Sequence, residues 1–193
     1  MATCCAQGMR PAVELGLVQS DDRVRDLADK DAIRELLYLY CAASDRMDTA
    51  LVESVFSADA QLHYGYFDGG PKDLSAFSSR FLARFAATHH SLTNVIVRLE
   101  GQSARSLSYI TALHTGGTRK DGSRYDMLGC GRYIDLLHKR DGVWRIAERT
   151  VVFDGNLELP GSFEWPEKFL AFRGRRDRSD PSYRVVSVPD ALD

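Results

Sequence analysis

Residues 131–150 read GRYIDLLHKRDGVWRIAERT, and their pattern is the clearest indication of the fold. It consists of two runs rich in β-branched and aromatic residues on either side of Arg140-Asp141-Gly142, a sequence typical of a tight turn between antiparallel strands. Outward from this turn, similar runs separated by short loops lie at residues 93–100, 104–115, 125–139 and 143–153. We therefore predict a meander of long antiparallel strands in the C-terminal half.

The N-terminal half has helical spacing instead. Residues 29–48 read DKDAIRELLYLYCAASDRMD, and their apolar residues recur at steps of three and four along a stripe that ends in Ser44 and Asp45. We place the start of this helix near Ser20, further helices at 49–56, capped by Asp48, and at 72–88, and a strand at 60–67. Helices followed by a curved meander predict an α+β fold, a cone-shaped antiparallel sheet covered by N-terminal helices.

Length and composition indicate one ordinary globular domain. The chain has 193 residues, 44% of them hydrophobic and 27% charged, with a formal net charge of −2. This charge favours neither nucleic acid nor an anionic membrane as a partner, and no apolar run approaches the roughly 20 residues of a membrane span. We expect a cytoplasmic protein with a small-molecule substrate.

We divide the chain into three segments. We expect a flexible tail at 1–19, the α+β domain at 20–155 and a C-terminal extension at 156–193. The extension contains large apolar side chains that suit a pocket lid or a subunit contact rather than a free linker. These are Phe163, Trp165, Phe169, Leu170 and Phe172.

No motif for a metal or cofactor is present in the sequence. Cys4, Cys5, Cys41 and Cys130 have no metal or redox spacing, and the histidines at 63, 114 and 138 have no ligand spacing. Phosphate loops, nucleophile elbows and dinucleotide fingerprints are absent as well. We expect no metal and no cofactor.

The stretches at 29–48 and 131–150, together with HHSLTN at 89–94, resemble the SnoaL-like branch of the nuclear transport factor 2-like superfamily. The resemblance implies an α+β cone, used in that superfamily by cofactor-free lyases and isomerases and also by binding and assembly modules. Within it the chain is most similar to scytalone dehydratase, bile acid dehydratase and lindane dehydrochlorinase. It implies an Asp and His pair in the cone, which falls on Asp45 and His90, and further site residues at Tyr40 and Arg149. Some dehydratases of this superfamily carry further carboxylates on the middle strands. This sequence lacks them, and Tyr109 and Thr111 are the residues nearest the corresponding positions.

Paired in this way, His90 and Asp45 would form a general base. The carboxylate fixes one ring tautomer and stabilises the imidazolium that forms when the other nitrogen accepts a proton. Strand alternation lets only one of His89 and His90 enter the cone, and the phase of the Thr93-Asn94 pair favours His90. The structural alternative is a buried histidine held by a helix-terminal acid.

Tyr40 and Arg149 are the candidate stabilisers of a developing oxyanion. Tyr40 is equally consistent with a core position. Arg149 falls on the opposite strand face from Trp144 and Ile146 unless a bulge shifts the phase, and a surface salt bridge is the alternative. Substrate-binding positions are expected from an aromatic, phenol-rich lining, namely Tyr64, Tyr109 and Tyr133, with Asp135 on the face of Tyr133.

The sequence thus predicts a cofactor-independent lyase for a hydrophobic hydroxylated aromatic or polycyclic molecule. Dehydration and a retro-aldol-like C–C cleavage, such as formaldehyde loss from a lignin-derived diarylpropane, both fit. A non-catalytic ligand-binding or assembly module and a polyketide cyclase or isomerase stay open as alternatives. By the same resemblance we expect a homo-oligomer, a trimer before a dimer.

Overall fold

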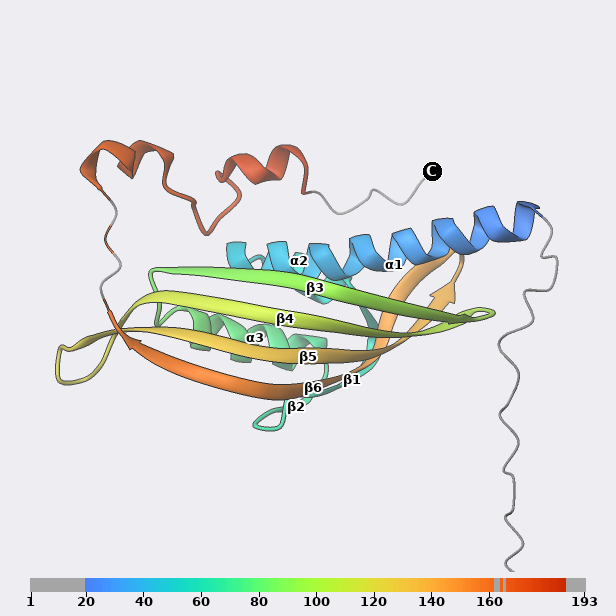
Figure 1. The fold of residues 1–193 in the computed structure, drawn as a ribbon, viewed down its shortest axis with the longest axis horizontal. Coiled ribbons are helices and arrows are strands. Elements are labelled where there is room, and N and C mark those ends of the chain that lie inside the picture. Colours follow the sequence, from blue (N-terminus) through green and yellow to red (C-terminus); the bar gives the residue numbers. More distant parts are fainter. Residues whose placement is uncertain (1–19, 162–163, 165, 187–193) are drawn as a thin grey trace, which may run out of the picture.

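The computed structural model describes residues 20–161, 164 and 166–186 (Figure 1). Its elements in chain order are α1 (Ser20–Arg46), α2 (Thr49–Ser54), β1 (Phe56–His63), β2 (Asp68–Gly69), α3 (Pro71–Leu82), β3 (Ala87–Glu100), β4 (Ser103–Thr118), β5 (Arg124–Arg140), β6 (Val143–Pro160) and the 3₁₀ helices η1 (Glu167–Phe172) and η2 (Pro181–Arg184). The predicted tail at 1–19, with Cys4 and Cys5, lies outside the described residues, as do Phe163 and Trp165.

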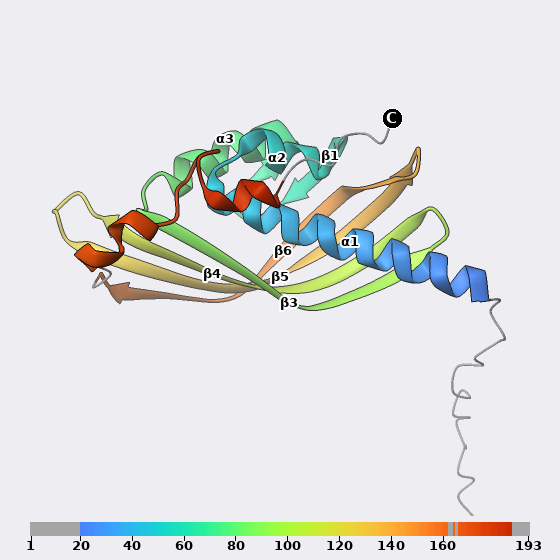
Figure 2. The ribbon, with the colours of Figure 1, turned by 90° about the horizontal axis from the view of Figure 1, so that it is seen from above.

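The strands of the described part form one curved sheet in the order β2-β1-β6-β5-β4-β3. The long strands β3 to β6 pair antiparallel in succession, as the turn sequences predict. β1 joins β6 in parallel, a pairing that the sequence did not indicate. The helices α1, α2 and α3 all lie on one side of the sheet (Figure 2). This arrangement confirms the predicted α+β cone.

The apolar stripe of α1 faces the sheet and forms much of the core. Ile33, Leu37, Tyr40 and Cys41 are all buried, and α1 makes most of its sheet contacts with β3. The helix ends at Arg46, so Asp45 occupies its last turn and is itself buried. The predicted helix position of this carboxylate is confirmed.

Several predicted element boundaries are wrong, among them the start of β3, predicted at 93 and observed at Ala87, and the end of β6, predicted at 153 and observed at Pro160. The helix predicted at 72–88 ends at Leu82, because residues from Ala87 onward pair with β4 and sheet pairing outweighs the helical spacing. The helix predicted at 49–56 does begin from the Asp48 cap, which accepts from the Leu51 amide at 3.1 Å, but it ends at Ser54. The strand predicted at 60–67 runs from Phe56 to His63 and then turns at Gly65, whose φ of 77° favours glycine.

A β-bulge in β6 determines which face Arg149 occupies. Leu137 pairs with Ile146 and Leu136 pairs with Glu148, so Ala147 is an extra residue with no partner in β5. The bulge shifts the alternation by one position. Trp144, Ile146 and Arg149 consequently all face the interior, which answers the question of phase that the sequence left open.

The segment at 173–186 returns to the helices after β6 ends at Pro160. Arg46 donates to Asp180 at 2.8 Å, and the Tyr183 hydroxyl donates to Asp48 at 2.8 Å. Both bonds join this segment to the α1–α2 junction, directly beside Asp45. In η1, Phe169, Leu170 and Phe172 are exposed to solvent.

Within the described residues, none of the helices has the length and apolar character needed to cross a membrane.

Candidate active site

Asp45 and His90 form a closely bonded pair between the last turn of α1 and the start of β3. The ring Nδ1 of His90 lies 2.6 Å from Asp45 Oδ1, and the backbone amide of His90 donates to Asp45 Oδ2 at 3.0 Å. Thr88 Oγ1 also donates to Asp45 Oδ1, at 3.3 Å. With Nδ1 engaged by the carboxylate, the neutral ring carries its proton there and leaves Nε2 as the acceptor. The predicted pairing of Asp45 with His90 is confirmed.

Strand alternation selects His90 over His89, as the sequence predicted. His90 lies opposite Ala112 in β4 and, like Ala112, lines the cavity described below. His89 points to the other face, where its ring bonds Ser91 at 3.1 Å in an exposed position.

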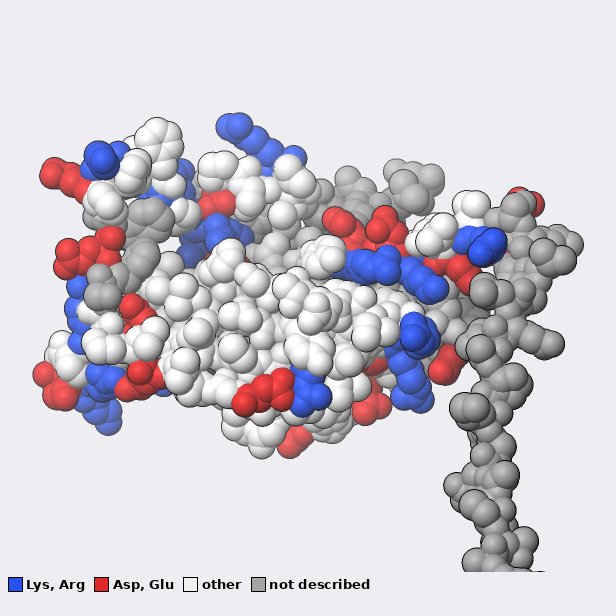
Figure 3. Space-filling model, viewed as in Figure 1, with Lys and Arg blue, Asp and Glu red and all other residues white. Residues whose placement is uncertain are grey.

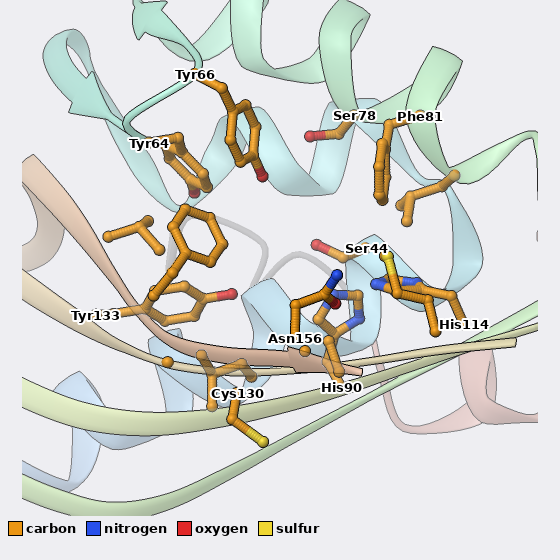
Figure 4. A pocket seen from close by; sticks show the side chains of 18 of the residues that line it. Ser44, Tyr64, Tyr66, Ser78, Phe81, His90, His114, Cys130, Tyr133 and Asn156 are labelled. Carbon is orange, nitrogen blue, oxygen red and sulfur yellow. The ribbon is translucent and has the colours of Figure 1, made fainter. Parts of the chain in front are cut away.

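A cavity of about 500 Å³ lies between the sheet and the helices, and His90 is part of its wall (Figure 4). Its polar groups include two sets of residues, besides Tyr40, Ser44, Ser78 and Asp154. Tyr64, Tyr66 and Tyr133 bring phenol rings to one side of the cavity, while His90, His114 and Asn156 gather on another. Aromatic and aliphatic side chains fill the remaining wall, among them Leu74, Phe77, Phe81, Ile110, Val151 and Phe153.

His114 is a second histidine of this wall. Its ring centroid lies 5.5 Å from that of His90, and it packs between Phe85 and Phe81 at 5.0 and 5.6 Å. Burial, followed by the charge of neighbouring His90, lowers the pKa of His114 to about 4, so this ring is uncharged at neutral pH. Its Nδ1 has no hydrogen-bond partner among the described residues. Because this nitrogen is itself buried, His114 lines the cavity through other atoms of its neutral ring.

The phenols of Tyr40 and Tyr64 form a hydrogen-bonded pair, 2.9 Å apart. Both residues line the cavity, and Tyr133 packs edge-on against Tyr40. Burial raises the pKa of Tyr64 and of Tyr133 well above the ordinary value, which keeps both phenols protonated. These groups can therefore donate hydrogen bonds to a ligand oxygen but cannot act as bases at neutral pH.

Arg149 lies beneath these phenols rather than in the cavity wall. It is fully buried and bidentate to Asp135, with bonds of 2.7 and 3.0 Å. Its guanidinium carbon lies 4.1 Å from the ring centroid of Tyr133 and 4.4 Å from that of Tyr40. Although burial opposes its charge, Asp135 raises the pKa of Arg149 well above the ordinary value. Arg149 thus supports the cavity from behind as one half of a buried ion pair.

Three predicted site residues are therefore placed differently from the expectation. Arg149 and Asp135 neutralise each other outside the cavity, because the bulge at Ala147 turns Arg149 inward to meet Asp135. Tyr109 lies on the outer face of β4 and is 41% exposed, since the even-numbered residues of this strand face the interior. The structure brings the other predicted residues together, with Tyr40, Tyr64, Tyr133 and His90 in the wall and Asp45 behind His90.

Sequence reasoning missed His114 and Asn156. His114 has no metal-ligand spacing, but the alternation Ser108, Ile110, Ala112, His114 marks it as inward-facing. Asn156 lies in β6 beyond the predicted strand end at 153. Among the described residues no cluster of three or more His, Cys, Asp or Glu side chains is placed to hold a metal ion.

Comparison with solved structures shows the same fold. A provisionally named scytalone dehydratase from Novosphingobium aromaticivorans superposes with a TM-score of 0.63 at 20% identity, covering 75% of this chain and 99% of the other. A hexachlorocyclohexane dehydrochlorinase from Novosphingobium barchaimii gives a TM-score of 0.63 at 21% identity, with coverage of 75% and 99%. At these identities the likeness concerns the fold alone.

The sequence comparisons are more specific. An uncharacterized protein of Mycobacterium tuberculosis, Rv2910c, is 30% identical over 132 residues, which is 66% of this chain and 86% of that protein. The uncharacterized protein Mb2934c of Mycobacterium bovis matches with the same identity and the same coverage. The model of the SnoaL-like domain matches residues 25–150, which contain both Asp45 and His90. The chain therefore belongs to the SnoaL-like domain family.

Proposed function

We propose that this protein is a cofactor-independent lyase that acts on a hydroxylated aromatic or polycyclic small molecule. The observation that carries the proposal is the 2.6 Å bond between Asp45 and His90 in the wall of a cavity. A histidine held only for structure would not need a ligand-sized space in front of its second nitrogen. This placement favours an enzyme over a non-catalytic binding or assembly module of the same fold.

His90 would act as the general base through Nε2. Asp45 holds the opposite nitrogen and would stabilise the imidazolium that forms when the base takes a proton. The carboxylate also accepts bonds from the His90 amide and from Thr88, so its orientation is set before any ligand arrives. This pre-organisation lowers the cost of reorganisation during the reaction.

Two eliminations fit this machinery. In a dehydration, His90 takes a proton from the carbon next to a carbinol, the C–H electron pair forms the double bond, and the hydroxyl leaves as water after receiving a proton. In the cleavage of a 1,3-diol, His90 takes the proton of the terminal hydroxyl. The C–C bond then breaks to release formaldehyde, and its electron pair forms the alkene as the other hydroxyl takes up a proton and leaves as water, so that the proton removed by the base is returned.

The lining of the cavity supports an aryl substrate with polar groups at two positions. A volume of about 500 Å³ lies within the range of small-molecule sites, which is roughly 300–1,000 Å³. Tyr64, Tyr133, His90 and His114 all line the cavity. The two phenols would donate to a phenolic or carbonyl oxygen, and the two histidines would lie near the reacting hydroxyl. A two-ring compound such as a lignin-derived diarylpropane diol matches this distribution.

The test is to incubate purified, metal-free protein with hydroxylated aryl and steroid compounds and to follow loss of water against loss of formaldehyde by mass spectrometry. His90→Ala and Asp45→Asn should each lower kcat/KM by roughly 10²–10⁴-fold, the usual contribution of a general base. His89→Ala is the matched control, since this neighbour points away from the cavity, and it should retain the activity of the wild type.

Full activity in His90→Ala or in Asp45→Asn would reject the proposed mechanism. An unchanged product mass would instead favour the alternative isomerase or cyclase.

A further inference from the structure

Residues 173–186 lie beyond the span that matches the SnoaL-like domain, which ends at residue 150, yet they return to the candidate active site. Asp180 anchors the segment by accepting from Arg46, the neighbour of Asp45, at 2.8 Å. Arg178 adds an ion pair with Asp48 at 3.1 Å. These contacts fix the segment against the end of α1.

From this anchored segment Arg176 reaches the end of α3. Its Nη1 donates to the Phe85 carbonyl at 2.6 Å, and its Nη2 donates to the Leu82 carbonyl at 3.0 Å. Carbonyls at a helix C-terminus lack the usual partners within the helix and carry partial negative charge, so a guanidinium there satisfies both the bonding and the charge. Arg173 adds a bond to the Ala86 carbonyl at 3.3 Å.

The turn that Arg176 binds forms the wall around His114. Phe81 and Leu82 line the cavity, and Phe85 packs at a shallow angle of 31° against the His114 ring. His114 in turn contacts the ring of His90. A displacement of this turn would therefore move the histidine that sits beside the base.

Arg176 also brings positive charge close to the pair. Burial lowers the pKa of Arg176, and the opposing contribution comes from Asp45, so the two side chains attract each other. The ionisable groups that act on His114 are His90 from β3, Asp45 from α1, Arg176 from the extension and Arg84 from the turn after α3. Of these, Arg176 alone both holds the turn and interacts with Asp45.

We propose that Arg176 is a positioning residue of the candidate active site, which fixes the turn against His114 and adds a positive charge near this ring, beside His90. This inference deepens the proposed function and rests on it for its catalytic meaning. The bonds and charges that carry it do not depend on which substrate is bound.

The experiment is an NMR titration of the imidazole nitrogens in the full-length chain, with His114 assigned from a His114→Gln variant. Arg176→Gln should raise the midpoint of His114 by about 0.5–1 pH unit, since one nearby positive charge is removed. Amide hydrogen exchange over residues 83–86 should become faster in the same variant. Arg176→Lys restores the charge and should return the midpoint toward that of the wild type.

Arg175→Gln is the matched control. This neighbour removes the same charge from the same segment, but its exposed side chain bonds Ser179 and not the α3 turn. It should leave both the His114 midpoint and the exchange unchanged. An unmoved midpoint in Arg176→Gln, or an equal shift in Arg175→Gln, would overturn the assignment. Because the titration requires no turnover, it tests Arg176 even if the wild type proves to have no lyase activity.

Discussion

His114 illustrates how a single buried side chain links the site to stability. Its ring is buried between Phe85 and Phe81 and against His90, and this environment holds its pKa at about 4. An unfolded chain would give the same histidine a pKa of about 6.5. The folded state therefore binds a proton at this position less readily than the unfolded state does.

This difference predicts a loss of stability in mild acid. Between about pH 6.5 and pH 4 the unfolded chain is protonated at His114 and the folded chain is not, so the free energy of unfolding falls as the pH decreases. The loss from this one group is on the order of 3 kcal/mol across the window. Urea denaturation at pH 7 and pH 4.5 measures it. His114→Gln should flatten the dependence, and an equally steep profile in that variant would assign the loss to other groups.

At the level of single residues, the sequence identifies candidate site residues more reliably than it predicts which face of a strand they occupy. Asp45 and His90 could be located because helix and strand periodicity each fix a face, and both side chains follow those periods. Arg149 could not be placed, since the extra residue at Ala147 exists only through the pairing of two strands. Tyr109 could not be placed for a related reason, because pairing with β3 and β5 sets which face of β4 turns inward.

The strands around the cavity depend on two glycines of β5. Gly129 and Gly131 both line the cavity, but they differ in the space beside them. A Cβ on Gly131 would lie 2.5 Å from the Val152 carbonyl oxygen, whereas one on Gly129 would meet nothing closer than the Ala112 carbonyl oxygen at 4.0 Å. β6 carries a further bulge here, where Cys130 pairs with Gly155 and Gly131 with Phe153.

Alanine at Gly131 should consequently lower the free energy of unfolding, whereas alanine at Gly129 should not. Gly131→Ala forces the β6 backbone away and should lower the free energy of unfolding by about 1–3 kcal/mol. Gly129→Ala has room for its methyl group and should leave stability unchanged or raise it by up to about 1 kcal/mol, because alanine restricts the unfolded chain. Paired urea denaturation curves check this. Equal destabilisation of both variants would show that the close approach at Gly131 is not the cause.

Element types were predictable from the sequence, and their ends and irregularities were not. The periods of α1 and of the meander gave the fold class, and Asp48 gave the start of α2. The end of α3 at Leu82 was missed because residues 83–88 keep helical spacing while pairing decides their structure. The parallel contact of β1 with β6 brings together residues far apart in the chain, which no local pattern reports.

At the scale of the whole molecule, no helix of the described residues covers the outer face of the sheet. Figure 3 shows a broad central surface there with few charged side chains. Its exposed apolar residues come from adjacent strands, namely Ile96 of β3, Tyr109 and Leu113 of β4 and Ile134 of β5. An apolar surface of this kind is typical of a contact between subunits. The homo-oligomer expected from the sequence stays a prediction, and this face is where we expect the contact.

Light scattering coupled to size exclusion tests that prediction. The wild type should elute as an oligomer, and we expect a trimer in preference to a dimer. Ile134→Glu should shift the protein toward the monomer, because the contact would desolvate the new charge. Val143→Glu is the control, since Val143 is 46% exposed, close to the 45% of Ile134, but lies at the tip of the β5–β6 hairpin. A monomeric wild type, or dissociation of both variants alike, would contradict the proposed contact face.

The proposed base is assembled from a helix end and a strand separated by more than forty positions in the chain, joined by the bond between Asp45 and His90. Neither the helix end nor the strand alone positions a proton acceptor, so the unfolded chain should have no catalytic activity. Turnover should then report the native population directly, and thermal inactivation should share its midpoint with the loss of near-ultraviolet circular dichroism. A simple activity assay would thereby serve as a folding sensor for variants away from the cavity, such as Ile134→Glu and Val143→Glu.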